Sequence, residues 1–289
     1  MEARTNRAKA IVYIVLASAF FGIGPVFVKE ALMGGTNVNL SLALRMFVIS
    51  VVGAVAARSR GSSMRVTKKQ LASLAVFGVI GYGLTNLLLS LSYLYVDMGV
   101  ATMCHFAYPI LVTLAMRVLY RENLSPSKLL AAICAVTGLV LLAQDNGIAN
   151  IKGILIAILS GAAYGIYVIA MDKAVFRTLN SFVVVSYVGG FCCIFFAVLT
   201  VCSGKAVTAP SLRVCTFLVI AAVMGSLAMM LLNKGVRAVG ASTAAFINML
   251  EPVINLAVDM GVYVAIPSVT GWGGCIMILL SVFLVSVKK

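Results

Sequence analysis

The stretch FINMLEPVIN, residues 246–255, contains one carboxylic acid and two amides within a segment that is otherwise apolar. An α-helix advances by about 100° per residue, so with Asn248 at 0° Glu251 lies at about 300° and Asn255 at about 340°. Asp259, at about 20°, extends the same face. Carboxylates and amides bind ammonium groups through charge-assisted hydrogen bonds, and a carboxyl group can also carry a proton. This face predicts a binding site for a polar solute, with Glu251 as the candidate for proton coupling.

The composition identifies the solvent in which this polar face must be stable. Of the 289 residues, 62% are hydrophobic and 10% are charged, whereas soluble domains are about 45 to 50% apolar and about 25% charged. The chain is therefore predicted to be an integral membrane protein. An acidic side chain near a bilayer centre costs about 2.5 to 3.5 kcal/mol on insertion scales. The polar face must then line protein or water rather than lipid.

Apolar runs of about 18 to 25 residues, the length that an α-helix needs to cross a bilayer, follow one another along the whole chain. They predict an all-α integral membrane fold with ten transmembrane helices, at about residues 10–32, 37–57, 71–94, 98–120, 127–144, 152–173, 180–203, 210–232, 241–265 and 270–287. The connectors are too short for an aqueous domain, so any function must reside in the helical bundle.

The basic residues predict the orientation, because Lys and Arg next to a span are retained on the cytoplasmic side. With the N-terminus inside, most of the 22 Lys and Arg residues fall on the cytoplasmic side, and the even number of spans puts both termini there. Topology thus accounts for the net charge of +14, and no basic run interleaved with aromatic residues indicates binding of nucleic acid. We expect a multi-pass protein of a bacterial cell (plasma) membrane.

An offset of 143 residues recurs along the chain. It relates Gly22 in ASAFFGIG to Gly165 in SGAAYGIY, and Pro109 in FAYPIL to Pro252 in MLEPVI. We infer two five-helix repeats, which are inverted relative to each other because five is odd. Inverted repeats around a central cavity are typical of secondary transporters that bind cargo near the bilayer midplane. The two repeats are expected at residues 1–147 and 148–289.

Both repeats contribute polar residues to the expected cavity. The offset pairs His105 with Asn248 and Tyr108 with Glu251, so these side chains should lie across the cavity from one another. Each also has a structural interpretation, since buried His, Tyr and Glu often serve in packing or in interhelical hydrogen bonds. The further candidates are Tyr82, Asn86, Tyr164, Tyr167 and Asn233.

Arg45 is a lone cation within the second predicted span. Ionisable residues inside membrane spans usually pair with one another or serve function. We interpret Arg45 as one half of a structural ion pair, with Glu30 or another carboxylate as its candidate partner, in preference to a contact with substrate.

Four stretches in the same order carry a family resemblance: LALRMF at 42–47, YLYVDMGVAT before the fourth span, AYPILVTLAMRVLYRENLS at 107–125 and KGVRAVGASTAAFINMLEPV at 234–253. They are similar to the drug/metabolite transporter (DMT) superfamily, in particular its EamA-type ten-helix bacterial exporters, which include amino-acid exporters. The likeness covers nearly the whole chain. It departs at residues 264–268, which read VAIPS where the family usually has a Gly-Glu pair. The resemblance implies outward transport of small organic solutes.

Acidic and amide groups beside aromatic rings favour a cargo that carries an ammonium group. We therefore predict a secondary-active exporter of small polar metabolites, such as neutral amino acids or amines, that works by alternating access. The alternatives are a transporter of other metabolites or drugs in the same fold, a channel, and a membrane scaffold subunit that transports nothing.

The sequence contains no motif for an enzyme, a cofactor or a metal. Its seven cysteines have no CxxC spacing and it has one histidine, which argues against a zinc site or a disulfide framework. The absence of an ATP-binding motif means that an ion or solute gradient must drive transport. The expected partners are the lipid bilayer and a small-molecule substrate, and we expect a monomer, with an oligomer left open.

Overall fold

The computed structural model describes residues 2–96, 98–123, 125–143, 150–203, 210–263 and 268–287. Residues 264–267 of the VAIPS stretch and the side chain of Asp259 lie outside this description. The described residues form α1 (Glu2–Met33), α2 (Val38–Ser59), α3 (Lys68–Val76), the π-helical segment η1 (Phe77–Gly83), α4 (Leu84–Ser92), α5 (Met98–His105), α6 (Tyr108–Tyr120), α7 (Pro126–Ala143), α8 (Ile151–Lys173), the 3₁₀ turn η3 (Val175–Thr178), α9 (Ser181–Cys202), α10 (Leu212–Val239), α11 (Ala241–Asn248), α12 (Leu250–Tyr263) and α13 (Val269–Val287).

The helices confirm the predicted membrane fold. Nine helical stretches in the described part of the chain are long and apolar enough to cross a bilayer, and Pro126–Leu141 is a shorter apolar helix that completes the predicted set. Large apolar side chains such as Phe47, Leu129 and Phe283 are exposed on the outside of the bundle. Such exposure of apolar side chains is expected where apolar lipid is the solvent. The spans are helical because a helix satisfies its own backbone hydrogen bonds in lipid.

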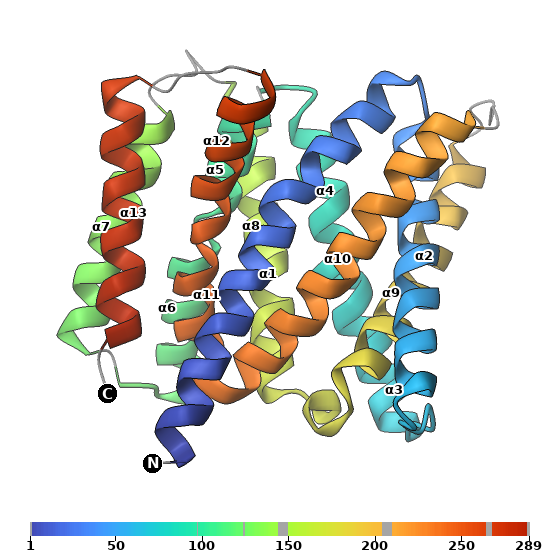
Figure 1. Ribbon diagram of the computed structural model, residues 1–289, viewed down its shortest axis with the longest axis horizontal. Helices are drawn as coiled ribbons and strands as arrows, with labels where there is room; N and C mark the ends of the chain where they lie inside the picture. Colours follow the sequence, from blue (N-terminus) through green and yellow to red (C-terminus); the bar gives the residue numbers. More distant parts are fainter. Residues whose placement is uncertain are drawn as a thin grey trace.

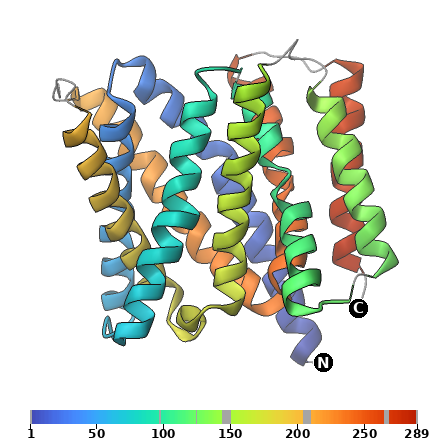
Figure 2. The ribbon, with the colours of Figure 1, turned by 180° about the vertical axis from the view of Figure 1, so that it is seen from behind.

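The two halves of the chain run in opposite senses through the bundle. Both termini lie at one end, and α8 begins at the other end from α1 (Figures 1 and 2). The bounds of α2 and α9 differ by 143 residues at both ends, and so do those of α5 and α11. Even the caps correspond, since Asn37 and Asn180 each accept a backbone N–H at the start of α2 and α9. These two pairs of helices therefore follow the repeat inferred from the sequence.

Spans four and nine are both broken near their middle. Span four consists of α5 and α6, separated after His105, and span nine consists of α11 and α12, separated at Met249. Pro109 and Pro252 fall in the first turn of the second half-helix, where a missing N–H is tolerated. The prediction of one continuous helix over residues 248–259 is wrong, because the break at Met249 interrupts that face between Asn248 and Glu251.

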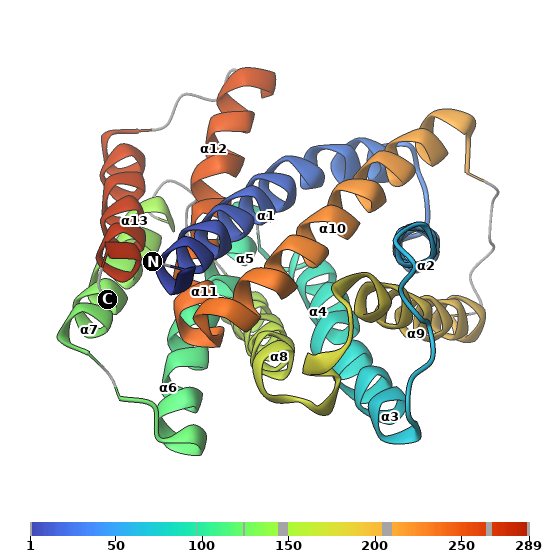
Figure 3. The same ribbon diagram turned by 60° about the horizontal axis from the view of Figure 1, so that its bottom comes forward.

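Long helices pair across the repeats: α1 with α10, α2 with α9 and α7 with α13 (Figures 1 and 3). Gly22 permits a close approach at the centre of the bundle. A Cβ at this position would lie 2.8 Å from Ile254 Cγ2 and 3.2 Å from the carbonyl oxygen of Glu251. The glycine therefore lets α1 pack directly against the first turns of α12. The same packing fixes the position of the Glu251 backbone, from which its side chain extends.

Candidate functional site

A cavity of about 180 Å³ lies between α1, α2 and α4. Its walls are the second half of α1, the first half of α2 and the length of α4, and its inner end is formed by His105, Tyr164 and Glu251. Pockets for drug-sized ligands are typically about 300 to 1,000 Å³. This cavity is smaller, so it suits a solute of few heavy atoms.

The inner end of the cavity lies where the two repeats meet. Two pairs of residues that are 143 positions apart, Phe21 with Tyr164 and Tyr82 with Gly225, line the same cavity. Residues related by an inverted repeat can share one cavity only close to the axis that relates the halves, which lies at the midplane of the bilayer in such folds. The cavity thus reaches the depth predicted for a transport site.

The outer end of the cavity faces away from the chain termini. Its lining includes Lys29 and Leu32 at the end of α1 and Val38 at the start of α2. The connection between these helices lies at the end of the bundle opposite both termini (Figure 1). The cavity therefore runs from the junction of the two repeats toward that opposite face.

Glu251 is the acidic group at the inner end of the cavity. It lies in the first turn of α12, where the free N–H groups of a helix favour a negative charge. The Asn248 Nδ2 group, across the helix break, donates to Glu251 Oε2 at 3.3 Å. The break in span nine thus supplies both a helix N-terminus and an amide donor for one carboxylate.

Asn248 is fully buried and is the centre of a hydrogen-bond network next to Glu251. Its Oδ1 accepts from Ser18 Oγ at 3.1 Å, and its Nδ2 also donates to Tyr108 Oη at 3.0 Å. The Tyr108 hydroxyl in turn donates to the Ala245 carbonyl at 3.4 Å. At the break the Met249 N–H bonds to Phe246 O, so the regular i−4 partner is replaced and the Ala245 carbonyl needs this other donor. Asn248 and Tyr108 are therefore positioning residues.

We expect Asn248→Ala to destabilise the protein by about 1 to 2 kcal/mol, the value of interhelical polar contacts in model membrane helices. The substitution leaves Tyr108 and Glu251 without their amide donor. Chemical unfolding in detergent micelles measures the change. Ser18→Ala is the matched control and should cost less, because the single hydroxyl hydrogen of Ser18 is shared between Asn248 Oδ1 and the Ile14 carbonyl of its own helix, which weakens the interhelical bond. Equal stability of Asn248→Ala and the wild type would contradict the network.

His105 is the last residue of α5 and lines the cavity. It is the only histidine among the described residues that line this cavity. Its Nδ1 lies 2.9 Å from Ser160 Oγ, and Ser160 Oγ lies 2.6 Å from the Ala157 carbonyl. A carbonyl can only accept, so the serine hydrogen points to Ala157 and the serine accepts from His105 Nδ1–H. Neutral His105 therefore has Nε2 as its remaining acceptor.

An aromatic cluster surrounds this histidine. The His105 ring centre lies 5.7 Å from that of Tyr108 and 5.5 Å from that of Tyr164, and the two tyrosines meet edge to face at 4.8 Å. Tyr82 packs on Tyr167 at 5.5 Å. Aromatic rings in such contacts form a rigid wall that can also face a cation.

The predicted ion pair between Arg45 and Glu30 is wrong. Glu30 pairs with Arg213, with 3.7 Å between Oε2 and Nη2, because α1 packs along α10 rather than turning Glu30 toward the bundle centre. Arg45 instead lines the cavity that holds Glu251, and its buried Nε has no hydrogen-bond partner in the described part of the chain. The sequence signal for this role was a lone cation within an apolar span.

The remaining candidates divide into two groups. Tyr82 and Asn86 line the cavity, and the Asn86 amide donates to the Tyr82 carbonyl at 2.8 Å. Asn255 is half-buried on α12 and is not part of the cavity wall, whereas Tyr167 and Asn233 are fully buried away from it. Lys29 lines the cavity too, and sequence reasoning missed Ser41 and Tyr93, which also belong to its wall.

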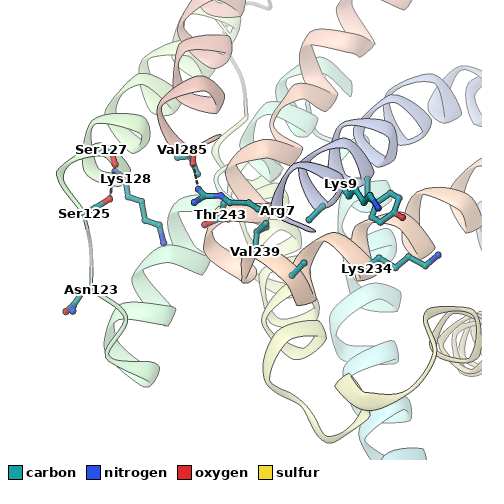
Figure 4. A pocket seen from close by; sticks show the side chains of 13 residues that line it. Arg7, Lys9, Asn123, Ser125, Ser127, Lys128, Lys234, Val239, Thr243 and Val285 are labelled. Carbon is teal, nitrogen blue, oxygen red and sulfur yellow. Dashed lines mark hydrogen bonds between the residues drawn. The ribbon is translucent and has the colours of Figure 1, made fainter. Parts of the chain in front are cut away.

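A second, larger cavity of about 1050 Å³ lies at the end of the bundle where both termini are (Figure 4). Arg7, Lys9, Lys128 and Lys234 line it, and Lys128 pairs with Glu122. Its wall is basic and hydroxyl-bearing, and neither Glu251 nor the aromatic cluster belongs to it. We take the smaller central cavity as the candidate functional site, because acidic and basic side chains line it together and it reaches the junction of the repeats.

Ten predicted spans in two inverted repeats, with a polar cavity to which the broken spans four and nine contribute His105 and Glu251, define a carrier-type membrane protein fold. The comparison with known families agrees, since the model of the EamA-like transporter family matches residues 8–144 and again 151–287. The chain belongs to the EamA-like transporter family. The two matches begin and end 143 residues apart, which is the offset found in the sequence.

Two of the proteins that are similar to this chain show how far the likeness extends. An uncharacterized transporter of Archaeoglobus fulgidus is 24% identical over 164 residues, which are 55% of this chain and 56% of the relative. The alignment therefore spans about half the length of that relative. A protein of known crystal structure is 19% identical, with a TM-score of 0.78 over 96% of both chains, and this likeness concerns the fold alone.

Proposed function

We propose that this chain is a secondary-active transporter that moves small zwitterionic solutes, such as neutral amino acids, across the plasma membrane by alternating access. One observation carries the proposal: an acidic residue, Glu251, and a basic residue, Arg45, line one small cavity that reaches the junction of two inverted repeats. A solute with an ammonium and a carboxylate group would satisfy both ends through charge-assisted hydrogen bonds. Amines are the second candidate, supported by Glu251 and the aromatic wall alone.

The proposed orientation has both termini in the cytoplasm. It is supported by the basic residues Arg7, Lys9, Lys128 and Lys234, which gather around the cavity at the termini face, as the positive-inside rule predicts. The present arrangement is then open to the outside.

Export as the direction of transport rests on the resemblance to EamA-type exporters. An ion or solute gradient would drive it, and Glu251 is the candidate proton carrier.

Counterflow into liposomes tests the function directly. Purified protein is reconstituted into vesicles preloaded with one unlabelled amino acid or amine, and uptake of the same labelled solute is followed at two pH values. We expect uptake to overshoot and to saturate with concentration for small neutral amino acids, because a carrier exchanges its cargo. Flux that rises linearly without exchange would indicate a channel. Folded protein that moves no member of the panel would favour the scaffold subunit.

A further inference from the structure

The inverted repeat predicts a second path, on the termini side of the cavity, that mirrors the first. Adding 143 to the residues that line the outer cavity maps Gly24 to Tyr167, Lys29 to Asp172 and Ser90 to Asn233. These three residues lie on α8 and α10, in the half of each helix that leads to the termini face (Figures 1 and 2). In an alternating-access carrier, the path on one side is the repeat-swapped copy of the path on the other.

The two halves differ in burial at matching positions. Val38, at the mouth of the outer cavity, is 41% exposed, whereas its counterpart Ser181 is 4% exposed. Pro25 is exposed and its counterpart Val168 is buried, and Ser90 is half-buried whereas Asn233 is 0% exposed. One path is therefore open and the repeat-related path is sealed.

The sealed half contains polar atoms that lack partners. Both side-chain atoms of Asn233 and the hydroxyl of Tyr167 are buried without a hydrogen-bond partner in the described part of the chain. Asp172 is also buried there, beside Lys173 at 3.2 Å. Buried polar groups are nearly always bonded, so an amide with neither atom satisfied calls for an explanation. A structure in which water or a solute reaches Asn233 would supply one.

We propose that Tyr167, Asp172 and Asn233 line a second path from the central site to the termini face, and that Asn233 binds the cargo when this path is open. The proposal rests on the transport function inferred above. An amide has both a donor and an acceptor, so Asn233 suits either the carboxylate or the ammonium group of a small zwitterionic solute. The unsatisfied amide also disfavours the sealed state, which helps the path to open.

Site-directed labelling tests the path without relying on transport. Asn233→Cys, Ser90→Cys and Ser281→Cys are prepared separately, and membrane vesicles of both orientations are treated with an impermeant, hydrophilic thiol reagent. Peptide mass mapping reads each position apart from the seven native cysteines. Ser281 is the matched control, because it is also 0% exposed with an unpartnered hydroxyl, but it lies on α13, outside both paths.

Asn233→Cys should be labelled from the termini face only, at least about tenfold faster than Ser281→Cys, because minor conformations of a two-state protein reach about 0.1 to 10% of the population. Ser90→Cys should be labelled from the opposite face only. Labelling of Asn233→Cys at the rate of Ser281→Cys, or from the face that labels Ser90→Cys, would overturn the proposal. Sided labelling in a protein that shows no counterflow would refute the transport function and leave the path standing.

Asn233→Leu tests the contact with cargo. Counterflow should fall about 10- to 140-fold, the effect of one hydrogen bond to a charged group, while stability in detergent stays equal to the wild type or rises. Ser281→Ala should give the same or higher stability with normal counterflow. If folded Asn233→Leu gave the same counterflow as the wild type, in a preparation in which the wild type is active, Asn233 would not contact the cargo.

Discussion

Glu251→Gln should lower counterflow of amino acids and amines about 10- to 140-fold, because a hydrogen bond to a charged group is worth about 1.5 to 3 kcal/mol and each 1.4 kcal/mol is a factor of ten. The substitution keeps the size of the side chain and an oxygen that accepts from Asn248. It removes the negative charge that faces an ammonium group. Initial rates of uptake into preloaded liposomes give the measurement, with protein quantity matched by immunoblot.

Glu30→Gln is the matched control for this substitution. Glu30 is also an acid near the bilayer, but it pairs with Arg213 away from the central cavity. Its loss should leave counterflow close to that of the wild type. If Glu251→Gln retained full counterflow and only lowered the yield of folded protein, Glu251 would be an interhelical hydrogen-bonding residue and the transport site would lie elsewhere.

The same variant examines proton coupling. A carboxyl group that binds and releases a proton during the cycle makes net transport depend on a pH gradient, whereas glutamine cannot exchange that proton. We expect an imposed pH gradient to drive net uptake or efflux by the wild type and to have no effect on Glu251→Gln. Equal responses of the two proteins would exclude Glu251 as the proton carrier.

The fold could be predicted from the sequence because its two strongest signals are physical requirements. A chain in lipid must satisfy its backbone hydrogen bonds internally, so each span is a helix. Because the side chains of that helix face lipid, the span appears in the sequence as a long apolar run. The inverted repeat appears as a fixed offset, since Gly22 and Gly165, or Pro109 and Pro252, keep matching positions in helices that pack alike. The bounds of α2 and α9, and those of α5 and α11, follow that offset.

The interior of the site could be predicted only in part. Glu251, His105, Tyr82, Asn86 and Tyr164 do line one cavity, because ionisable and polar residues inside a span avoid lipid. The break between α11 and α12 was not foreseen, since a proline in an apolar run is compatible with either a bend or a new helix start.

The roles of Asn248 and Arg45 could not be read from spacing. Asn248 forms hydrogen bonds with Ser18 on α1 and Tyr108 on α6. A helical wheel describes one helix at a time, so it cannot show contacts between distant segments. Arg45 and Glu30 lie close in sequence but on different helices, and the packing of α1 along α10 gives Glu30 to Arg213. Pairing in three dimensions therefore decided which cation faces the site.

Arg45→Met should separate the two candidate cargo classes. The guanidinium group is the cation that would bind the carboxylate of an amino acid, and a paired charge-assisted contact of this kind is worth about 1.5 to 3 kcal/mol. Counterflow of neutral amino acids should then fall about 10- to 140-fold. Counterflow of amines that lack a carboxylate should stay the same or rise, because a positive charge no longer faces an ammonium group in the same cavity.

The stability of Arg45→Met distinguishes this role from a structural one. The Arg45 Nε is buried without a partner in the described residues, and an unpaired cation in a membrane bundle is costly, so methionine should leave unfolding in detergent unchanged or shift it to higher denaturant. A structural ion pair would instead give lower stability and equal losses for both cargo classes. Since Glu251 and Arg45 line the same 180 Å³ cavity, losses for amino acids in both variants, but for amines in Glu251→Gln alone, would assign one end of the cargo to each residue.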